Sequence, residues 1–371
     1  MINLFQPSVG EAEVNAIREV FASNWLGPGT QVRAFEQMFA GYIGRPADEF
    51  LALTSCTEAL FQAISSLGVG PADEVILPSV SFVGAGHAVR SAGAQIVLCD
   101  VDPETLNPQL EHFERAITSK TKAAIILHYG GRPGAVAEIA ALAKSRSISL
   151  IEDAAISLGS ISQGKACGTF GDVGCWSFDS MKTLSTGDGG MLWTRNPEII
   201  ERVRNNIRLG VCASGFHRRG HSREWWEVEP STAGRWATMN DITAAMGLVQ
   251  LDRVPGFLRR REELSARYDA ELCDLAWLRL PRPAPHQTAR TFYWIQTAPG
   301  IRDRLAQHLL QSEIYTSFRY WPLHRMRMYL SSKPFPGADL ATASTLLLPL
   351  HQGLSDSDAE QVIAAVRAFS P

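Results

Sequence analysis

The sequence predicts an α/β fold with a mainly parallel sheet, followed by a smaller α+β region. Two observations lead to this prediction. Between about residues 50 and 155, short apolar runs alternate with stretches of helical periodicity, and after about residue 245 the alternation stops. Runs that are apolar throughout are typical of strands buried on both faces, and a helix after each strand is the usual crossover in a parallel sheet. Functional side chains in such folds gather at the carboxyl ends of the strands.

Two helices are expected before the sheet region. Apolar residues in 9–44 recur at steps of three and four, and the Gly-Pro-Gly of "NWLGPG" divides the pattern into two amphipathic helices. The expected strands follow in order as "FLALTS", "EVILPS", "QIVLCDVD", "AAIILHY" and "ISLIEDAA". The expected crossover helices are "TEALFQAISSLG", "GAGHAVRSAG" and "AVAEIAALAKSRS".

The last third of the chain has a different pattern. The segment "GLVQLDRVPGFLRRREELSARYDAELC" predicts a long charged helix that connects the sheet region to the C-terminal residues. After it, "TFYWIQTA" predicts a strand and "IRDRLAQHLLQS" predicts a helix. We therefore expect a smaller C-terminal α+β domain.

The composition argues against several classes of protein. Of the 371 residues, 45% are hydrophobic and 20% are charged, and a formal charge of -3 gives no electrostatic basis for nucleic-acid binding. The six cysteines form no CxxC pair, which indicates neither a metal site nor a disulfide framework and fits a reducing compartment. The chain starts without the profile of a signal peptide, and no apolar run approaches the roughly 18 residues of a membrane helix. A cytoplasmic protein without membrane contact is expected.

One lysine lies in an unusual setting. In "SFDSMKTLSTGDGG", Lys182 stands between small hydroxyl residues and a glycine-rich turn. Such a segment can hold a lysine by its backbone and partly desolvate the amine, which lowers its pKa and frees the neutral nitrogen to attack a carbonyl. On its own, the segment fits an ordinary solvated loop lysine better than a catalytic one.

Two strand ends add groups that could serve the same site. In "TSCTEAL" a strand ends in small hydroxyl residues and a helix begins, so the amides of Cys56 and Thr57 could hold a phosphate. In "LIEDAA" a strand delivers Glu152 and Asp153 at its carboxyl end, where a buried carboxylate needs a partner such as a protonated ring nitrogen. An ordinary capped helix and a surface acid are the alternatives.

A hydroxyl and an aromatic ring complete the set. Ser177, five residues before the lysine, could reach a phosphate at the same mouth of the sheet. Phe82 in "LPSVSFVGAG" has small neighbours and suits stacking on a flat ring, with a core position as the alternative. A phosphate cradle, an acid for a ring nitrogen, a stacking ring and a Schiff-base lysine are together what pyridoxal 5'-phosphate (PLP) requires.

These segments resemble a known family, the PLP-dependent sugar aminotransferases of the DegT/DnrJ/StrS type, within the aspartate aminotransferase fold. The resemblance covers nearly the whole chain. It is carried by "SNWLGPGTQVRAFEQMFAGYIG", "TSCTEAL", "HYGGRP", "LIEDAAISLG", "GDVGCWSFDSMKTLSTGDGGML", "MNDITAAMGLVQL" and "FRYWPLH". It implies a fold type I transferase with two domains. The large one, residues 1–250 with the N-terminal helices, would hold a mainly parallel seven-stranded sheet flanked by helices, and the small α+β one would span residues 251–371.

The resemblance also implies roles for the site residues. Lys182 would bind the cofactor as a Schiff base and, once displaced, move the proton between substrate and cofactor. Asp153 would keep the pyridine nitrogen protonated. The remaining cofactor contacts, three to the phosphate and one to the ring face, would fall to Ser177, Cys56, Thr57 and Phe82.

Three positions depart from the family pattern. Ile156 stands where members usually have Gln or His in contact with the phenolic oxygen of the cofactor, and Trp236 stands where many place an Asn that reaches the partner subunit's phosphate. Asp179 replaces a common His. Lys182 itself is retained, which disfavours the related sugar dehydratases, where His replaces it.

The expected reaction is transfer of an amino group from an amino acid, with L-glutamate as the expected donor, to the keto group of a nucleotide-linked deoxysugar. It would run as two half-reactions through pyridoxamine phosphate, in a homodimer with shared active sites, and would serve amino-sugar biosynthesis for an antibiotic or polysaccharide. The candidate contacts to the substrates are basic or aromatic residues from two segments, namely Arg319, Tyr320 and His324 in "FRYWPLH" and Arg218, Arg219 and Arg223 in a basic loop.

There are three alternative functions, one within the same family and two outside its chemistry. An aminocyclitol transaminase acting on a keto-inositol would use the same site without a nucleotide. A PLP-bound regulator without turnover is disfavoured because Lys182, Asp153 and Ser177 are all intact. A nicotinamide-dependent oxidoreductase lacks its glycine fingerprint after an early strand.

Overall fold

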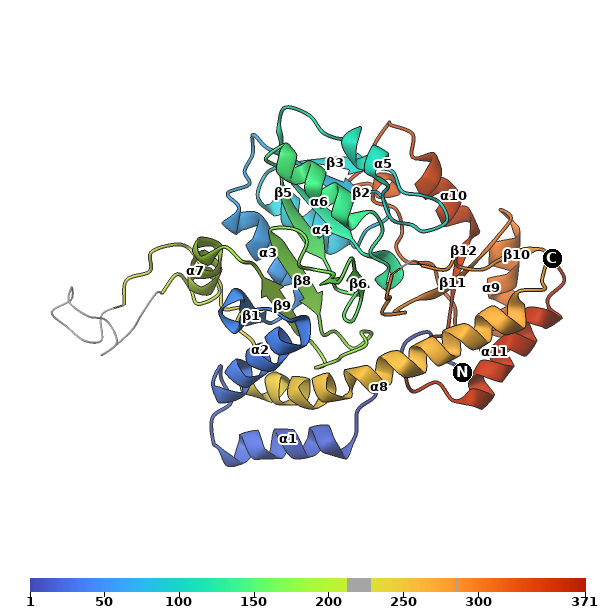
Figure 1. Ribbon diagram of the computed structural model, residues 1–371, viewed down its shortest axis with the longest axis horizontal. Coiled ribbons are helices and arrows are strands. Elements are labelled where there is room, and N and C mark those ends of the chain that lie inside the picture. The colour runs from blue at the N-terminus through green and yellow to red at the C-terminus, as the bar shows by residue number, and fades with distance from the viewer. Residues whose placement is uncertain (212–227, 285) are drawn as a thin grey trace.

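The computed structural model describes residues 1–211, 228–284 and 286–371 (Figure 1). Within these residues the main sheet has seven strands in the order β1-β9-β8-β5-β4-β2-β3. Neighbouring strands are parallel except at β9, which is antiparallel to both β1 and β8. The strands are β1 (Phe50–Leu53), β2 (Glu74–Pro78), β3 (Gln95–Cys99), β4 (Thr121–Leu127), β5 (Ser149–Asp153), β8 (Val173–Ser177) and β9 (Gly190–Trp193).

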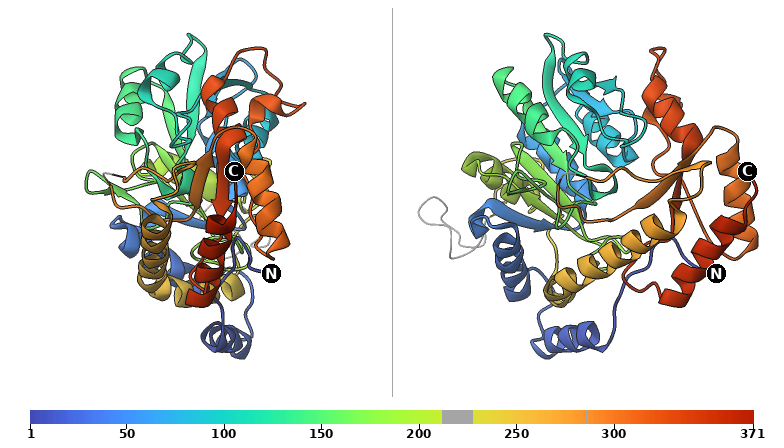
Figure 2. Two further views of the ribbon diagram at one scale, coloured as in Figure 1. Left: turned by 90° about the vertical axis from the view of Figure 1, so that its right-hand side faces the viewer. Right: turned by 45° about the vertical axis from the view of Figure 1, so that its right-hand side comes forward.

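Helices cover both faces of this sheet (Figure 2). One face is covered by α3 (Cys56–Ser66), α4 (Val83–Ser91) and α7 (Pro197–Asn206). Their apolar residues pack in one cluster with alternate residues of the strands, Ile151 of β5 and Cys175 of β8 among them. Because side chains alternate along a strand, Asp153 and Ser177 belong to this same face.

The opposite face is covered by two groups of helices. The shorter α5 (Leu110–Glu114) and α6 (Val136–Ser145) pack over β2, β4 and β5. The pair α2 (Thr30–Ile43) and α8 (Asp241–Leu272) packs over β1, β8 and β9. Helix α1 (Glu11–Ala22) lies outside them against α8, at the bottom of Figure 1. The sheet is thus buried on both sides, which explains why its strands are apolar throughout.

The C-terminal part contains a second, antiparallel sheet in the order β10-β11-β12. Long α8 leads into it from the main sheet, and its start is fixed by the Asn240 side chain, which accepts a hydrogen bond from the Thr243 amide at 3.0 Å. The elements of this part are β10 (Leu278–Arg279), β11 (Tyr293–Thr297), α9 (Ile301–Gln311), η4 (Leu323–Arg325), α10 (Pro336–Ser344), β12 (Thr345–Leu348) and α11 (Asp356–Ala368). The short elements elsewhere are η1 (Ala47–Glu49), η2 (Tyr129–Gly131), β6 (Ile161–Ser162) and β7 (Lys165–Ala166).

An apolar cluster joins the two sheets at the carboxyl edge of the main one. It contains Val80, which follows β2, Leu127, which ends β4, and Ile156, which follows β5. Trp294 and Leu347 of the small sheet pack against them. The strand ends that carry the candidate site residues therefore face the C-terminal part.

The structure confirms the predicted fold class, an α/β chain with a mainly parallel seven-stranded sheet flanked by helices. The division into domains at residues 1–250 and 251–371 stays a prediction. The first residues lie with the C-terminal part, since the Ile2 amide donates to the Glu313 carbonyl at 2.7 Å, and α8 continues across residue 250. Among the described residues, no helix combines the length and apolar character needed to cross a membrane.

Candidate active site

Strand β5 ends in two carboxylates that the fold sends to opposite faces of the sheet. Glu152 lies on the face of α6, where it accepts hydrogen bonds from the Gly168 and Gly171 amides, each at 2.7 Å, and contacts His128 Nε2 at 2.9 Å. These bonds fold the loop before β8 around a fully buried acid. Glu152 is therefore held for structure, with both carboxylate oxygens engaged by the protein.

Asp153, its neighbour, lies on the face of α3 and accepts far fewer hydrogen bonds to offset the burial of its charge. It is 1% exposed, and its one hydrogen bond from the described residues comes from the Ala155 amide at 3.1 Å. Burial raises the pKa of the Asp153 carboxyl, against the lowering effects of that amide and of the charges on Lys182 and His128. A buried carboxylate with so few donors is suited to receive a cationic ligand atom.

Lys182 reaches the same space from the loop between β8 and β9. Its backbone amide donates to the Asp179 carbonyl at 2.9 Å, which holds the loop in a turn. Its amine makes no hydrogen bond or ion pair with any described residue, and burial lowers the pKa of this amine, while Cys56 and Asp153 act in the opposite direction. A lowered pKa favours the neutral amine, which is the form that attacks a carbonyl.

Helix α3 presents its N-terminus to this space. The Ser55 side chain accepts the Glu58 amide at 3.0 Å, which caps the helix. The amides of Cys56 and Thr57 come first in the helix and have no intrahelical acceptor, so they remain available to an anion. The predicted phosphate cradle thus has the local structure that the sequence indicated.

Ser177 is placed beside this helix by strand register. In neighbouring strands Gly190 is opposite both Leu53 and Ser177, so one row across the sheet joins the end of β1 to the end of β8. Leu53 leads directly into the Ser55 cap. A hydroxyl at Ser177 can therefore act together with the first amides of α3.

Gly190 makes this close approach possible, and its replacement gives a first prediction. A Cβ at this position would lie 2.3 Å from the Cys56 amide nitrogen. We expect Gly190→Ala to push β9 and α3 apart, to lower the free energy of unfolding by about 2–4 kcal/mol, and to weaken cofactor binding. Urea unfolding and a PLP titration measure the two effects.

Gly41→Ala is the matched control, because a Cβ there meets nothing within 4 Å on the exposed side of α2. It should leave PLP affinity unchanged and stabilise the fold by up to about 1 kcal/mol. Equal behaviour of the two variants would show that the contact between β9 and α3 has no role in holding the cofactor.

Phe82 lies at the start of α4 with its ring partly free. It is 39% exposed, and its ring centroid lies 5.8 Å from that of Tyr320, edge to face. Gly84 lets the ring fold over the first turn of α4, since a Cβ there would lie 2.7 Å from it. The exposed ring fits the predicted stacking role better than the core position that was its alternative.

The C-terminal part contributes Arg319 and Tyr320 to the same space. The Tyr129 hydroxyl bonds the Arg319 carbonyl and so holds the segment. The Arg319 guanidinium lies 3.4 Å from the sulfur of Met181, next to the lysine, and no carboxylate among the described residues lies within ion-pair distance of it. Burial raises the pKa of the Tyr320 hydroxyl, and the charge of Asp153 raises it further. Both residues are therefore close to the candidate catalytic pair.

His324 is placed differently from its two companions. Both of its ring nitrogens are engaged, Nδ1 with the Ser79 hydroxyl at 2.5 Å and Nε2 with Asp339 at 3.1 Å, and its ring stacks on Phe335. These bonds, and that from the Leu323 amide to the Ser79 carbonyl at 2.8 Å, tie the segment to the end of β2. They suit His324 to a positioning role, and its predicted substrate contact stays a prediction. The other predicted contacts, Arg218, Arg219 and Arg223, lie outside the described residues.

The three departures from the family pattern also have definite places. Ile156 is buried in the apolar cluster between the sheets, where it replaces a polar group by packing. Trp236 is 65% exposed and pairs with Arg208 in a short antiparallel bridge. Asp179 accepts the Met181 amide at 3.0 Å and so shapes the lysine turn.

Several residues of the site could not be found from the sequence. His128 and Ser79 are buried beside the catalytic strands but belong to no motif that reveals their partners. Tyr129 and Asp339 act through Arg319 and His324, about 190 and 15 residues away in the chain. One feature of the sequence could have pointed to His128, namely its position directly after an apolar strand.

The chain is similar to known proteins over nearly its whole length. The profile of the DegT/DnrJ/EryC1/StrS aminotransferase family matches residues 7–367. A dTDP-4-dehydro-2,3,6-trideoxy-D-glucose 4-aminotransferase from Saccharopolyspora spinosa is 47% identical over 365 residues, which cover 98% of this chain and 95% of that protein. The crystal structure of aminotransferase TlmJ from Streptoalloteichus hindustanus is 49% identical, with a TM-score of 0.95 over 99% of this chain and 98% of that one. A candidate sugar aminotransferase from Streptococcus pneumoniae, solved in its PLP form, is 25% identical, with a TM-score of 0.89 over 98% of this chain and 97% of that one.

Proposed function

Because the chain belongs to the DegT/DnrJ/EryC1/StrS aminotransferase family, with PLP as its cofactor, we propose that it aminates the 4-keto group of a dTDP-linked deoxysugar, using L-glutamate as donor. One observation supports the catalytic part most strongly. Among the described residues, the Lys182 amine has no partner and the buried Asp153 carboxylate has one donor, and both lie beside the first amides of α3.

The residues of this site fit PLP. Within the described part of the chain, the Lys182 amine and the Asp153 carboxylate have no oppositely charged partner within ion-pair distance. The amides of Cys56 and Thr57 have no acceptor there either, so a phosphate could serve as one. Phe82 offers an exposed ring, and Ser177 a hydroxyl beside the helix. When bound, PLP supplies an aldehyde that takes up the amino group and a ring that withdraws electrons from the bond being broken.

The protein groups then have distinct tasks. Lys182 Nζ would remove the proton from the substrate carbon that bears the nitrogen, and burial favours this role because it lowers the pKa of the amine. Asp153, which is 1% exposed, would hold a proton on the ring nitrogen by charge pairing. The α3 amides and Ser177 would hold the phosphate and so keep the reacting atoms in one orientation.

The choice of acceptor comes from the relative that acts on a dTDP-4-dehydro-trideoxy sugar. The test is to incubate the PLP-loaded protein and L-glutamate with a dTDP-4-keto-deoxysugar, and separately with a keto-inositol, and to follow the products by mass spectrometry. An aminated nucleotide sugar, with 2-oxoglutarate in excess of one equivalent per active site, is expected only in the first reaction. Amination of the keto-inositol alone would make the protein an aminocyclitol transaminase.

Arg319 is proposed to bind an anionic group of a substrate, either the donor carboxylate or the acceptor phosphates. It has no acidic partner among the described residues and lies beside the lysine loop. We expect Arg319→Ala to raise KM for one of the two substrates by about tenfold or more, since a charged hydrogen bond is lost. Arg327→Ala, an exposed arginine of the same segment, should change neither KM. Unchanged kinetics of Arg319→Ala with both substrates would remove the assignment.

We propose a homodimer in which exposed apolar groups near β1 are covered by a second copy. Trp25 and Trp236 are 59% and 65% exposed, and Leu26 beside the first is 44% exposed. The Asp241 amide bonds the Leu26 carbonyl at 3.2 Å, so the turn around Trp25 and the segment after Trp236 lie together. Large exposed apolar groups on neighbouring segments are typical of an interface. Sedimentation should give twice the chain mass, and a monomer at micromolar concentration would contradict the proposal.

A further inference from the structure

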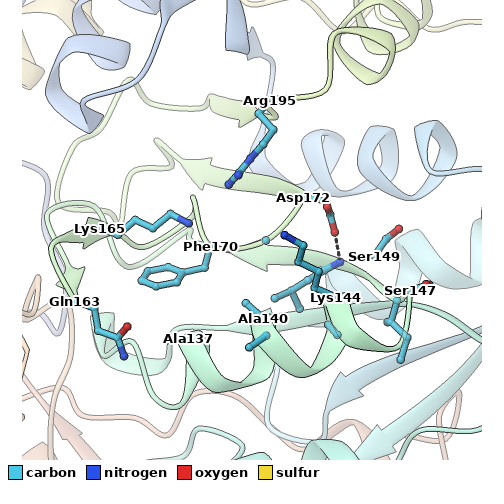
Figure 3. Close-up of a pocket in the computed structure, with 15 residues that line it drawn as sticks. Ala137, Ala140, Lys144, Ser147, Ser149, Gln163, Lys165, Phe170, Asp172 and Arg195 are labelled. Atoms are coloured by element: carbon cyan, nitrogen blue, oxygen red, sulfur yellow. Dashed lines mark hydrogen bonds between the residues drawn. The ribbon is translucent and has the colours of Figure 1, made fainter.

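A second concave region lies at the opposite edge of the sheet from the active site. Its cavity has a volume of about 730 Å³ and lies between α6, the β6-β7 hairpin and the loop that leads into β8 (Figure 3). Ser149, which lines it, begins β5, whereas Asp153 ends the same strand. The two sites are therefore separated by the length of a strand, roughly 13 Å at about 3.3 Å per residue.

Three cationic side chains converge on this cavity. Lys144 comes from the last turn of α6, Lys165 from the hairpin and Arg195 from the chain after β9, and Figure 3 shows their charged ends directed into the same space. None of the three has a carboxylate within ion-pair distance in the described part of the chain. Asp172 is the one acid among the lining residues, and its Oδ2 already accepts the Leu150 amide at 2.8 Å.

The arrangement leaves positive charge without compensation. Burial lowers the pKa of the Lys165 amine, and repulsion from Arg195 and Arg45 lowers it further, while buried Glu152 acts against them. Solvated surface lysines can move apart, but Lys165 is held over the Phe170 ring at 4.7 Å, and Arg195 is held by a bond to the Thr169 carbonyl at 3.3 Å. Like charges fixed in this way favour an anion between them.

The shape of the cavity indicates the kind of anion. The volume lies within the range of about 300–1,000 Å³ that is usual for small-molecule sites, and alanines of α6 leave its floor open. Because three cations line the cavity and its one acid is already hydrogen-bonded, a ligand with more than one negative charge is favoured. We propose that this cleft binds a small anion of the diphosphate class, either inorganic diphosphate or a nucleoside diphosphate. The proposal does not depend on the reaction assigned to the active site.

The test uses the PLP-loaded protein, in which the cofactor covers the phosphate cradle of α3. Isothermal titration calorimetry at low salt measures inorganic diphosphate and dTDP in separate arms. We expect the double variant Lys165→Gln and Arg195→Gln to weaken diphosphate binding by about tenfold or more, because two of three attractive charges are lost. Wild-type affinity should also fall with rising salt. If a nucleoside diphosphate is the preferred ligand, dTDP should bind at one variant-sensitive site more tightly than inorganic diphosphate.

Two controls separate the proposal from misfolding and from net charge. The charge-retaining pair Lys165→Arg and Arg195→Lys should bind like the wild type, and the glutamine pair should keep the wild-type rate of reaction with L-glutamate. Arg18→Gln, an exposed arginine of α1, should leave binding unchanged. The proposal is overturned if wild-type protein binds neither anion at millimolar concentration, if the glutamine pair binds as tightly as the wild type, or if Arg18→Gln loses binding equally.

Discussion

Replacing Lys182 by alanine should reduce the rate of amino transfer by about 10⁴-fold or more, because the chain loses its carbonyl nucleophile and its proton carrier together. The lysine amine is desolvated and unpartnered, and no other lysine among the described residues lies beside Asp153. The variant should also lack the visible absorption band of the lysine-bound cofactor. It should still bind PLP weakly, through the phosphate contacts of α3.

The measurement is the initial rate of 2-oxoglutarate release, together with peptide mapping after borohydride reduction of the PLP-loaded protein. Reduction should fix the cofactor on the peptide that contains Lys182. Lys182→Arg keeps the positive charge and should be equally inactive. Lys165→Ala is the matched control, because burial lowers the pKa of that amine too but it lies at the opposite edge of the sheet. A reduced cofactor on any other lysine would refute the assignment.

Replacing Asp153 by asparagine should lower the rate by about 10²–10³-fold, as expected when one preorganised electrostatic contact is lost from a buried site. Asparagine keeps the acceptor for the Ala155 amide but cannot pair with a ring proton. The absorption spectrum of the bound cofactor should therefore change while PLP remains bound. Stopped-flow absorbance during reaction with L-glutamate measures the rate.

Asp153→Asn should lower the reaction rate but raise the stability of the cofactor-free protein. Folding raises the pKa of Asp153 above its ordinary value of 3.8, so the folded state holds this proton more tightly than the unfolded state. Stability is then lost as pH rises from that value through the raised pKa. Asp153→Asn removes this loss and should be more stable than wild type at neutral pH, with a difference that shrinks toward acidic pH. A variant that is less stable than wild type at neutral pH would contradict this explanation of the carboxylate.

Glu152→Gln provides the contrast within the same strand. Glu152 is fully buried with two amides and His128 bonded to it, so removal of its charge should lower the free energy of unfolding by about 3 kcal/mol. The spectrum of the bound cofactor should stay close to that of wild type. If the two variants exchanged these effects, the assignment of the two carboxylates would be reversed.

The positions of site residues at or just after the end of a strand could be predicted from the sequence. Continuous apolar runs indicated the sheet, and a parallel sheet brings the ends of its strands to one edge, which is enough to place Asp153, Cys56 and Ser177 together. The period of two along β5 even separates Glu152 from Asp153, although only the structure shows what Glu152 bonds.

Long-range contacts could not be predicted in this way. The chain from Ser79 through His324 to Asp339 joins two parts of the sequence about 245 residues apart, and nothing local distinguishes a bonded histidine from one that binds substrate. The cationic cleft was missed for the same reason, because Lys144, Lys165 and Arg195 come from three separate elements. Their meeting depends on how the hairpin and α6 pack on the sheet.

The proposed mechanism depends above all on Lys182 carrying a PLP cofactor that accepts an amino group in this site. The visible spectrum of the PLP-loaded protein, recorded before and after L-glutamate is added without any sugar, tests this directly. We expect an absorption band that is absent from Lys182→Ala and that converts to the pyridoxamine form, with release of one 2-oxoglutarate per active site. A wild-type protein that shows no such band, or a band that no amino donor changes, would overturn the mechanism.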